Sequence, residues 1–213
     1  MEKCEWILLA IYIIWRVIKL NKITKKNVIP ILSVTVVGVL LGLFSAYIDN
    51  RHIHINFFLG QINVNAILSN FGIWILIALF ISLKSEKSIS AAIRVLFFFL
   101  SLNITFHIYH LLIHVNVNSY MLIWYTITAI SPFLAVLCHK IKQDNILAVL
   151  LSAGVISVML LQIMSSNHDD MYCEIIFLIC AIILMHKKLI TTLISLCIGP
   201  AIAFFLYQMP FFS

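Results

Sequence analysis

The sequence predicts an all-α fold, a polytopic bundle of transmembrane helices with about eight spans. Hydrophobic residues make up 63% of the 213 residues and charged residues only 10%, where a soluble domain would carry about 25% charged residues. Mean hydropathy is +1.10. Apolar runs of membrane-spanning length recur along the chain, and the basic residues gather in short clusters between them. We therefore expect residues 1–213 to form a single transmembrane domain in the cell membrane.

Eight apolar runs are candidate spans. They cover residues 5–19, 28–48, 65–83, 90–115, 120–138, 145–164, 171–185 and 189–208. The first and the seventh are short for a hydrocarbon core of about 30 Å, so the prediction extends from six to eight full crossings. Glu2, Lys3 and Glu5 precede the apolar stretch 6–18 of the first run, and the lysines at 19–26 follow it, which does not fit a signal peptide. We expect that run to be retained as a helix.

The basic residues predict the orientation of the chain. If all eight runs cross, alternate connections hold basic clusters within residues 19–26, 84–87, 140–142 and 187–188. With Arg16 and Arg94, which lie near the same ends of their runs, twelve of the fourteen Lys and Arg residues are then on one side, leaving Lys3 and Arg51. Because basic residues concentrate in cytoplasmic loops, both termini are predicted to lie outside the cell. The net charge of +6 then faces the anionic inner leaflet, and we expect a bilayer partner and no nucleic acid.

The second span and the segment after it carry local signals. Gly38 and Gly42 form a GxxxG motif that Ala46 continues, a pattern typical of close helix packing. We expect its partner to be another span of this chain rather than a second copy. From Arg51 to Phe57 polar and apolar residues alternate, which predicts an extended or re-entrant segment at the outer interface. Asn63 and Asn65 are then candidate caps for the third span.

The fourth span contains the candidate ligand-binding residues Asn103, His107, His110 and His114. Their spacings of 4, 3 and 4 place them within about 60° of one another on one helix face. Toward the N-terminal end the same face holds only Leu96, Phe99 and Leu100, so the polar stripe stops about halfway along the span. Polar residues at this depth in a membrane are costly and mark functional sites.

The depth of each polar side chain of the fourth span in the membrane predicts its surroundings. We expect Asn103 and His107 to face the interior of the bundle. His110 and His114 should lie closest to the loop at 49–56 or the loop at 165–174. The carboxylates within their reach would be Asp49, Asp169 and Asp170. Each imidazole needs a hydrogen-bond partner, a carboxylate or water at that position.

A zinc site is a further hypothesis for the same stripe. His110 and His114 stand at i and i+4 and could bind one Zn²⁺ from adjacent turns. His52, His54, His168 or Asp169 could supply the remaining protein ligand. The HxxxH pattern with a distant His, a Ser and an Asp is similar in residue types to the alkaline ceramidase class of lipid hydrolases. No HExxH glutamate is present as a general base.

Proline interrupts the fifth span at Ser131-Pro132 and the eighth at Gly199-Pro200. Such breaks line binding sites in transporters, but proline is also common in membrane helices, and we favour this ordinary interpretation. The five cysteines contain no CxxC pair, which argues against a zinc knuckle or a thioredoxin-like site. Six glycines and no phosphate-binding loop exclude a nucleotide-binding domain, so any ATP would be used by a separate ATPase.

Three short pieces of the sequence support a resemblance. They are Leu68-Ser-Asn-Phe-Gly-Ile-Trp74, Ser88-Ile-Ser-Ala-Ala92 and the stretch from Trp124 to Leu134. They resemble an uncharacterised group of small polytopic membrane proteins from low-GC Gram-positive bacteria, over spans three to six. The resemblance implies a membrane fold and no activity. Members of the group have tyrosines near Phe106, His107 and Tyr109, which makes the histidines a feature of this chain.

Three classes of function remain. The first, which we predict, is binding or transport of a small solute or ion through a polar vestibule open to the outside. The second is a non-catalytic membrane subunit with an immunity, regulatory or assembly role, working with other membrane subunits. The third and least favoured is an enzyme, an intramembrane zinc-dependent lipid hydrolase.

Overall fold

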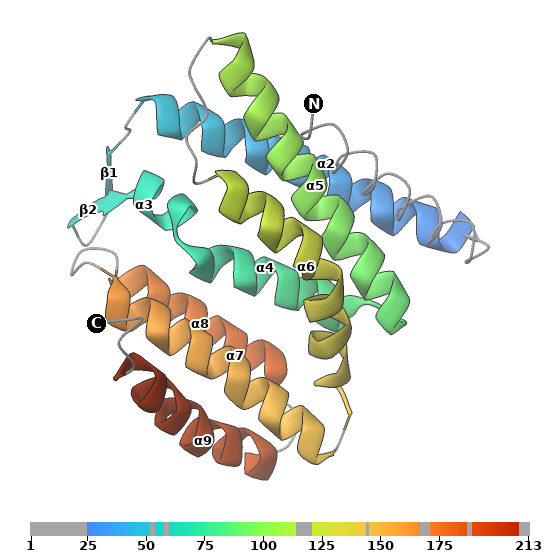
Figure 1. The fold of residues 1–213 in the computed structure, drawn as a ribbon, viewed down its shortest axis with the longest axis vertical. Coiled ribbons are helices and arrows are strands. Elements are labelled where there is room, and N and C mark those ends of the chain that lie inside the picture. Colours follow the sequence, from blue (N-terminus) through green and yellow to red (C-terminus); the bar gives the residue numbers. More distant parts are fainter. Residues whose placement is uncertain are drawn as a thin grey trace.

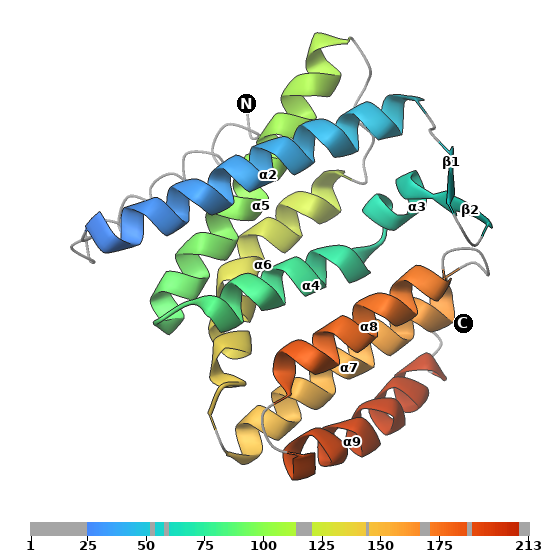
Figure 2. The ribbon, with the colours of Figure 1, turned by 180° about the vertical axis from the view of Figure 1, so that it is seen from behind.

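The computed structural model describes residues 25–51, 54–57, 60–113, 121–143, 145–166, 171–186 and 189–208. Within these ranges the chain is helical apart from one hairpin, which confirms the predicted all-α class (Figures 1 and 2). The helices are α2 (Lys25–Arg51), α3 (Val64–Ser69), α4 (Phe71–Lys84), α5 (Ser88–Leu112), α6 (Met121–Lys140), α7 (Ile146–Ser165), α8 (Met171–Met185) and α9 (Leu189–Tyr207). The strands are β1 (His54–Phe57) and β2 (Gly60–Asn63). The first predicted span, 5–19, lies outside the described residues.

Five of the described helices are long and apolar enough to cross a membrane. They are α2 over Val28–Asn50, α5, α6, α7 and α9 over Ile190–Tyr207. The helices α4 and α8 are equally apolar but shorter, with 14 and 15 residues. Large apolar side chains such as Leu112, Phe133 and Ile183 are more than half exposed, as a lipid-facing surface requires. The chain is therefore a multi-pass membrane protein.

The helix α4 lies between two groups of helices (Figures 1 and 2). On one side it contacts α5 and α6, with α2 packed on α5. On the other side it contacts α8 and α7, with α9 packed on α7. Each side has its own apolar core, the first around Trp74 and Phe98 and the second around Leu79, Ile156 and Met159. The arrangement makes α4 the common wall of the two cores.

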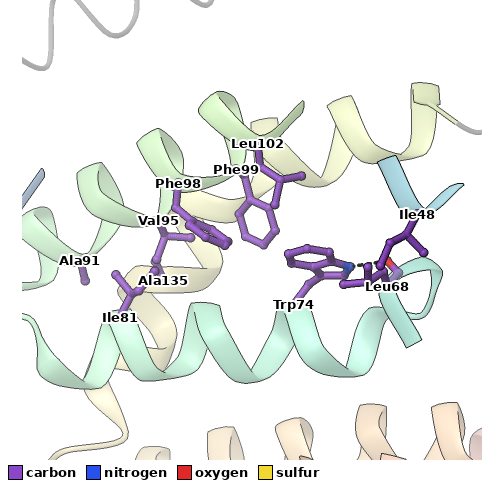
Figure 3. Packing of buried hydrophobic residues seen from close by; sticks show 10 residues of the cluster. All are labelled: Ile48, Leu68, Trp74, Ile81, Ala91, Val95, Phe98, Phe99, Leu102 and Ala135. Carbon is purple, nitrogen blue, oxygen red and sulfur yellow. Dashed lines mark hydrogen bonds between the residues drawn. The ribbon is translucent and has the colours of Figure 1, made fainter. Parts of the chain in front are cut away.

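The third predicted span, 65–83, is divided into two helices. The short α3 ends at Ser69 and α4 begins at Phe71, with extended backbone at Asn70 between them. The indole N–H of Trp74 donates to the carbonyl of Leu68 at 2.8 Å and so bridges the break from within the core (Figure 3). The prediction that Asn65 caps the span is wrong, because Asn65 lies inside α3.

The segment after α2 forms a two-stranded antiparallel hairpin. Strand β1 pairs with β2 so that His54 lies opposite Asn63 and Phe57 opposite Gly60. The alternation of polar and apolar residues up to Phe57 predicted this extended conformation. The hairpin connects the end of α2 to the start of α3.

The GxxxG motif of α2 packs against α5. A Cβ on Gly42 would lie 2.6 Å from the carbonyl oxygen of Leu102, and one on Gly38 would meet the Oγ of Ser101. Ala46, one turn further, is fully buried. The expected intramolecular partner of the motif is thus confirmed, because only residues without a side chain allow this approach of two helix backbones.

Pro132 lies inside the continuous helix α6 and Pro200 inside α9, so neither interrupts its span. Pro132 leaves the carbonyl of Thr128 without its helical donor, and the hydroxyl of Ser131 donates to that oxygen at 2.9 Å. Beside Pro200, the carbonyl of Gly199 accepts from the hydroxyl of Ser157 in α7 at 2.8 Å. The Ser131 hydroxyl thus satisfies the carbonyl that Pro132 leaves free, whereas the Ser157 hydroxyl joins α9 to α7 beside Pro200. Both contacts are structural, which favours the ordinary interpretation of the two prolines.

Candidate functional site

The polar face of α5 is formed by Asn103, His107 and His110, and α5 carries it between α2 and α6. The helix ends at Leu112. His114 lies outside the described residues. The three remaining side chains have different surroundings. Asn103 and His110 are buried, with 2% and 4% of their surface exposed, whereas His107 is half-buried.

Asn103 ties α5 to α6. Its Nδ2 donates to the hydroxyl of Thr128 at 2.6 Å and to the carbonyl of Trp124 at 3.3 Å. The Thr128 hydroxyl donates in turn to the Trp124 carbonyl at 2.8 Å. The prediction that Asn103 faces the interior is confirmed. The amide hydrogens of Asn103 are used within the protein, as a buried polar group between membrane helices requires.

His107 lies at the edge of the contact between α5 and α6. Its Nδ1 is 3.0 Å from the phenolic oxygen of Tyr125, with which it shares a hydrogen bond. Tyr125 itself is 39% exposed. His107 was expected to face the bundle interior. It does so only in part, because the rotation from Asn103 to His107 along the helix carries its side chain toward the rim of α6.

His110 makes one contact with each ring nitrogen. Nδ1 lies 3.0 Å from the backbone carbonyl of Phe106, and Nε2 lies 3.3 Å from Oδ2 of Asp49 in α2. The rings of Phe106 and Tyr109 pack against the imidazole, with centroids 4.3 and 5.9 Å away. The expectation that His110 lies near the 49–56 segment is confirmed.

The contact of His110 with the Phe106 carbonyl restricts the tautomer of its ring. A carbonyl oxygen only accepts, so Nδ1 of His110 must carry a hydrogen. Nε2 would then present a lone pair to the carboxylate of Asp49 unless a positive charge lies between them. A proton on either atom meets this need, and so does a bound cation. Oδ2 of Asp49 and Nε2 of His110 can therefore share one proton or one metal ion, and 35% of the Asp49 side chain is exposed.

The zinc hypothesis can be compared with this geometry. Two ligands of a tetrahedral zinc, each about 2.1 Å from the metal, lie about 3.4 Å apart. The 3.3 Å between His110 and Asp49 matches that separation. The bond from His110 Nδ1 to a carbonyl is the second-shell contact that zinc-bound histidines usually make.

The described residues contain no group of three His, Cys, Asp or Glu side chains that could hold a metal. The sequence predicts Asp49 as a carboxylate within reach of the histidines and not as a zinc ligand, so its contact with His110 adds a residue to the candidate site. Four of the other predicted ligands lie outside the described residues: His52, His114, His168 and Asp169. His54 lies in β1.

Sequence reasoning missed a buried carboxylate at a second place, between α8 and α4. Glu174, in the first turn of α8, is only 2% exposed. Its carboxylate occupies the space that a side chain on Gly72 would fill, with Cδ 2.8 Å from the position of such a Cβ. Gly72 lies in the first turn of α4, directly after the break at Asn70, whose side chain makes no capping bond. The start of a helix favours a negative charge, which explains how this carboxylate is accommodated.

A signal for this contact was present in the sequence. Glu174 is an acidic residue within an apolar run, and Gly72 is one of only six glycines. Their pairing depends on the packing of α4 against α8, which no periodicity reveals.

Two hollows of the described part lie away from the polar face of α5. One, of about 20 Å³, is between α7 and α9 near Ser152 and Ser195. The other, of about 360 Å³, is near Lys84 and Lys142. The predicted vestibule along the polar half of α5 therefore stays a prediction.

Comparisons with protein-family models, with curated proteins and with solved structures found no match for this chain. The fold alone thus assigns its class, which is a small polytopic membrane protein of apolar helices. The resemblance to a particular bacterial group stays a prediction.

Proposed function

We propose that the protein binds and transports a small cation through a site centred on Asp49 and His110. The observation that supports the proposal is the contact between the buried imidazole and the carboxylate, at 3.3 Å, at the end of two membrane-spanning helices. Ionisable residues within membrane spans are costly, and where they occur they mark ion pathways and proton relays. Of the wider class of small solutes, a cation fits best because a carboxylate oxygen and an imidazole nitrogen that face each other can hold a proton or a metal ion between them.

The proposed site would open to the outside of the cell. The basic side chains of Lys84, Lys87, Lys140 and Lys142 belong to the end of the bundle where α4 and α6 finish. Asp49 and His110 belong to the opposite end, where α2 and α5 finish. By the positive-inside rule, the first end is cytoplasmic and both termini of the chain are outside. Labelling of single cysteines should report the cytoplasm at the exposed positions Glu86 and Gln143, and an external signal at Gln143 would contradict this orientation.

The test distinguishes two candidate cations, Zn²⁺ and the proton. The full chain is purified and reconstituted into liposomes, and bound metal is measured by elemental analysis, zinc affinity by calorimetry and proton flux with an internal pH dye. Asp49→Asn and His110→Ala should each abolish either zinc binding or proton flux. The matched control is His186→Ala, because His186 is exposed and bonds only to the hydroxyl of Thr192 among the contacts of its ring. No bound zinc and a proton flux equal to that of empty liposomes would overturn the proposal.

A second candidate is a non-catalytic membrane subunit that works with other subunits. It is favoured by the hydrogen bonds of Asn103 and His107, which both end on α6 of the same chain and so hold helices together. In that case Asp49→Asn and His110→Ala would lower the temperature of unfolding and leave cation binding at background. The same two variants thus distinguish the two functions, by loss of cation binding or by loss of stability alone.

A further inference from the structure

A hollow of about 360 Å³ lies where α4 and α8 end, beside the connection from α6 to α7. Its walls include Phe80 and Leu83 of α4 and Ile183 of α8, and its lining also includes Lys84 and Lys142. Pockets for small molecules have volumes of about 300–1,000 Å³, so this hollow can hold a molecular group. The site is separate from the Asp49–His110 pair, which lies at the other end of α4 and α5.

Basic side chains converge on this end of α4. Nζ of Lys142 donates to the carbonyl of Ser85 at 2.8 Å, and Nη1 of Arg94 donates to the hydroxyl of Ser85 at 3.5 Å. The C-terminal end of a helix attracts cations, which explains why they gather there. The described charges near this end are five basic and one acidic: Lys84, Lys87, Arg94, Lys140, Lys142 and Glu86. The surplus positive charge favours an anion.

The apolar walls restrict the kind of anion. Phe80 is 47% exposed and Ile183 is 67% exposed, so both face outward from the bundle toward lipid. A bound lipid would place its acyl chain against these side chains and its head group at the basic end, whereas a water-soluble anion would use only the basic end. An occupant that is anionic at one end and apolar at the other therefore matches both parts of the lining.

We propose that this hollow binds an anionic phospholipid, with its phosphate near Lys84 and Lys142 and an acyl chain along Phe80 and Ile183. Basic pockets between membrane helices bind phosphate head groups in this manner. Lys142 is held in place by Ser85 and is thus ordered for the contact. Lys84 is exposed, with Nζ 6.0 Å from the centre of the Phe80 ring, so it can reach the phosphate from the other wall.

The experiment titrates the purified full chain in a non-ionic detergent with phosphatidylglycerol and follows its thermal unfolding. Phosphatidylglycerol should raise the unfolding temperature and phosphatidylcholine should not. Lys84→Gln should weaken the apparent affinity for phosphatidylglycerol about fivefold, the factor expected for one lysine near an anionic lipid. Lys87→Gln is the matched control, since it removes the same charge nearby from a residue that does not line the hollow. Because Lys84 is exposed, its replacement should leave the fold intact.

Two further arms separate the sources of the phosphate. Glycerol phosphate and inorganic phosphate at the same concentration should give no stabilisation, since neither covers Phe80. Equal stabilisation by these soluble anions would overturn the lipid assignment. Equal losses of affinity in Lys84→Gln and Lys87→Gln would also overturn it, because they would indicate a diffuse surface charge and no site.

Discussion

The two groups of helices on either side of α4 use polar side chains in different ways. Between α7 and α9, hydroxyl groups donate to backbone carbonyls, from Ser157 to Gly199 and from Ser195 to Val149. Among α2, α5 and α6, side chains bond to other side chains, and one of these contacts joins Asp49 to His110. A hydroxyl on a carbonyl holds two helices together without charge. An ionisable pair can also bind a cation, so the comparison separates the group with a candidate site from the group that serves as scaffold.

Both groups, in contrast, use glycine in the same way. Gly42 brings α2 onto the backbone of α5, and Gly199 brings α9 onto Ile156 of α7, where a Cβ would lie 2.7 Å from Cγ2. Close approach of helices is therefore a general feature of the bundle, and the charged pair is a feature of one group. Variants that affect packing and variants that affect the pair should give different results.

Gly42→Leu should have the largest effect. The new side chain would meet the carbonyl of Leu102 and Thr105, and separating α2 from α5 should cost about 3 kcal/mol or more of stability. The fraction of folded protein after thermal challenge, measured by size-exclusion chromatography in detergent, reports this loss. The matched control is Gly154→Leu in α7, where no atom lies within 4 Å of the added Cβ. If both variants fold equally well, the α2–α5 contact does not depend on its glycines.

Gly72→Ala should come next. The methyl group would take the space of the Glu174 carboxylate, and overpacking of this kind costs about 1–3 kcal/mol. A double-mutant cycle with Glu174→Ala should recover about 0.5–3 kcal/mol as an interaction term, because the second change removes the clash. Gly154→Ala is the control for the effect of alanine alone. An interaction term of zero would show that Glu174 and Gly72 do not compete for the same space.

Asn103→Ala and Ser157→Ala compare the two kinds of polar contact directly. Loss of the Asn103 amide leaves the buried carbonyl of Trp124 and the hydroxyl of Thr128 to rearrange, at a cost of about 1–3 kcal/mol. Loss of the Ser157 hydroxyl removes one hydrogen that the carbonyls of Ala153 and Gly199 share, and should cost about 1 kcal/mol. Thermal unfolding in detergent measures both. Neither variant should alter cation binding, and a loss of binding in Ser157→Ala would contradict the division into site and scaffold.

Much of this fold follows from local sequence properties. The five longest helices coincide with apolar runs because membrane spans require continuous hydrophobicity. Topology predicts that Asp49 and His110 lie on the same side of the membrane, because α2 and α5 run in the same direction, and their contact follows from the packing of α2 against α5. The break at Asn70 was not predictable, because no proline or charge marks it. The contact that bridges it, from Trp74 to the carbonyl of Leu68, arises from the folded core.

The candidate site was predictable in its residue types and less so in its chemistry. The spacing of Asn103, His107 and His110 placed them on one face of α5. Spacing could not show that Thr128 and Tyr125 of α6 would engage the first two, since these partners depend on how α6 is rotated against α5. The burial of Glu174 against α4 was missed for the same reason.

Tyr125→Phe should have the smallest effect and will locate the edge of the site. Its hydroxyl bonds to His107 at a position open to the surroundings, so removal should cost less than about 1 kcal/mol of stability. His107 is one turn from His110 on the polar face, yet its Nδ1 faces α6 while Nε2 of His110 faces Asp49 in α2. The two imidazoles therefore serve different contacts, and cation binding measured by calorimetry should be unchanged in Tyr125→Phe. If binding weakens, His107 belongs to the cation site and the site extends from α2 across α5 to α6.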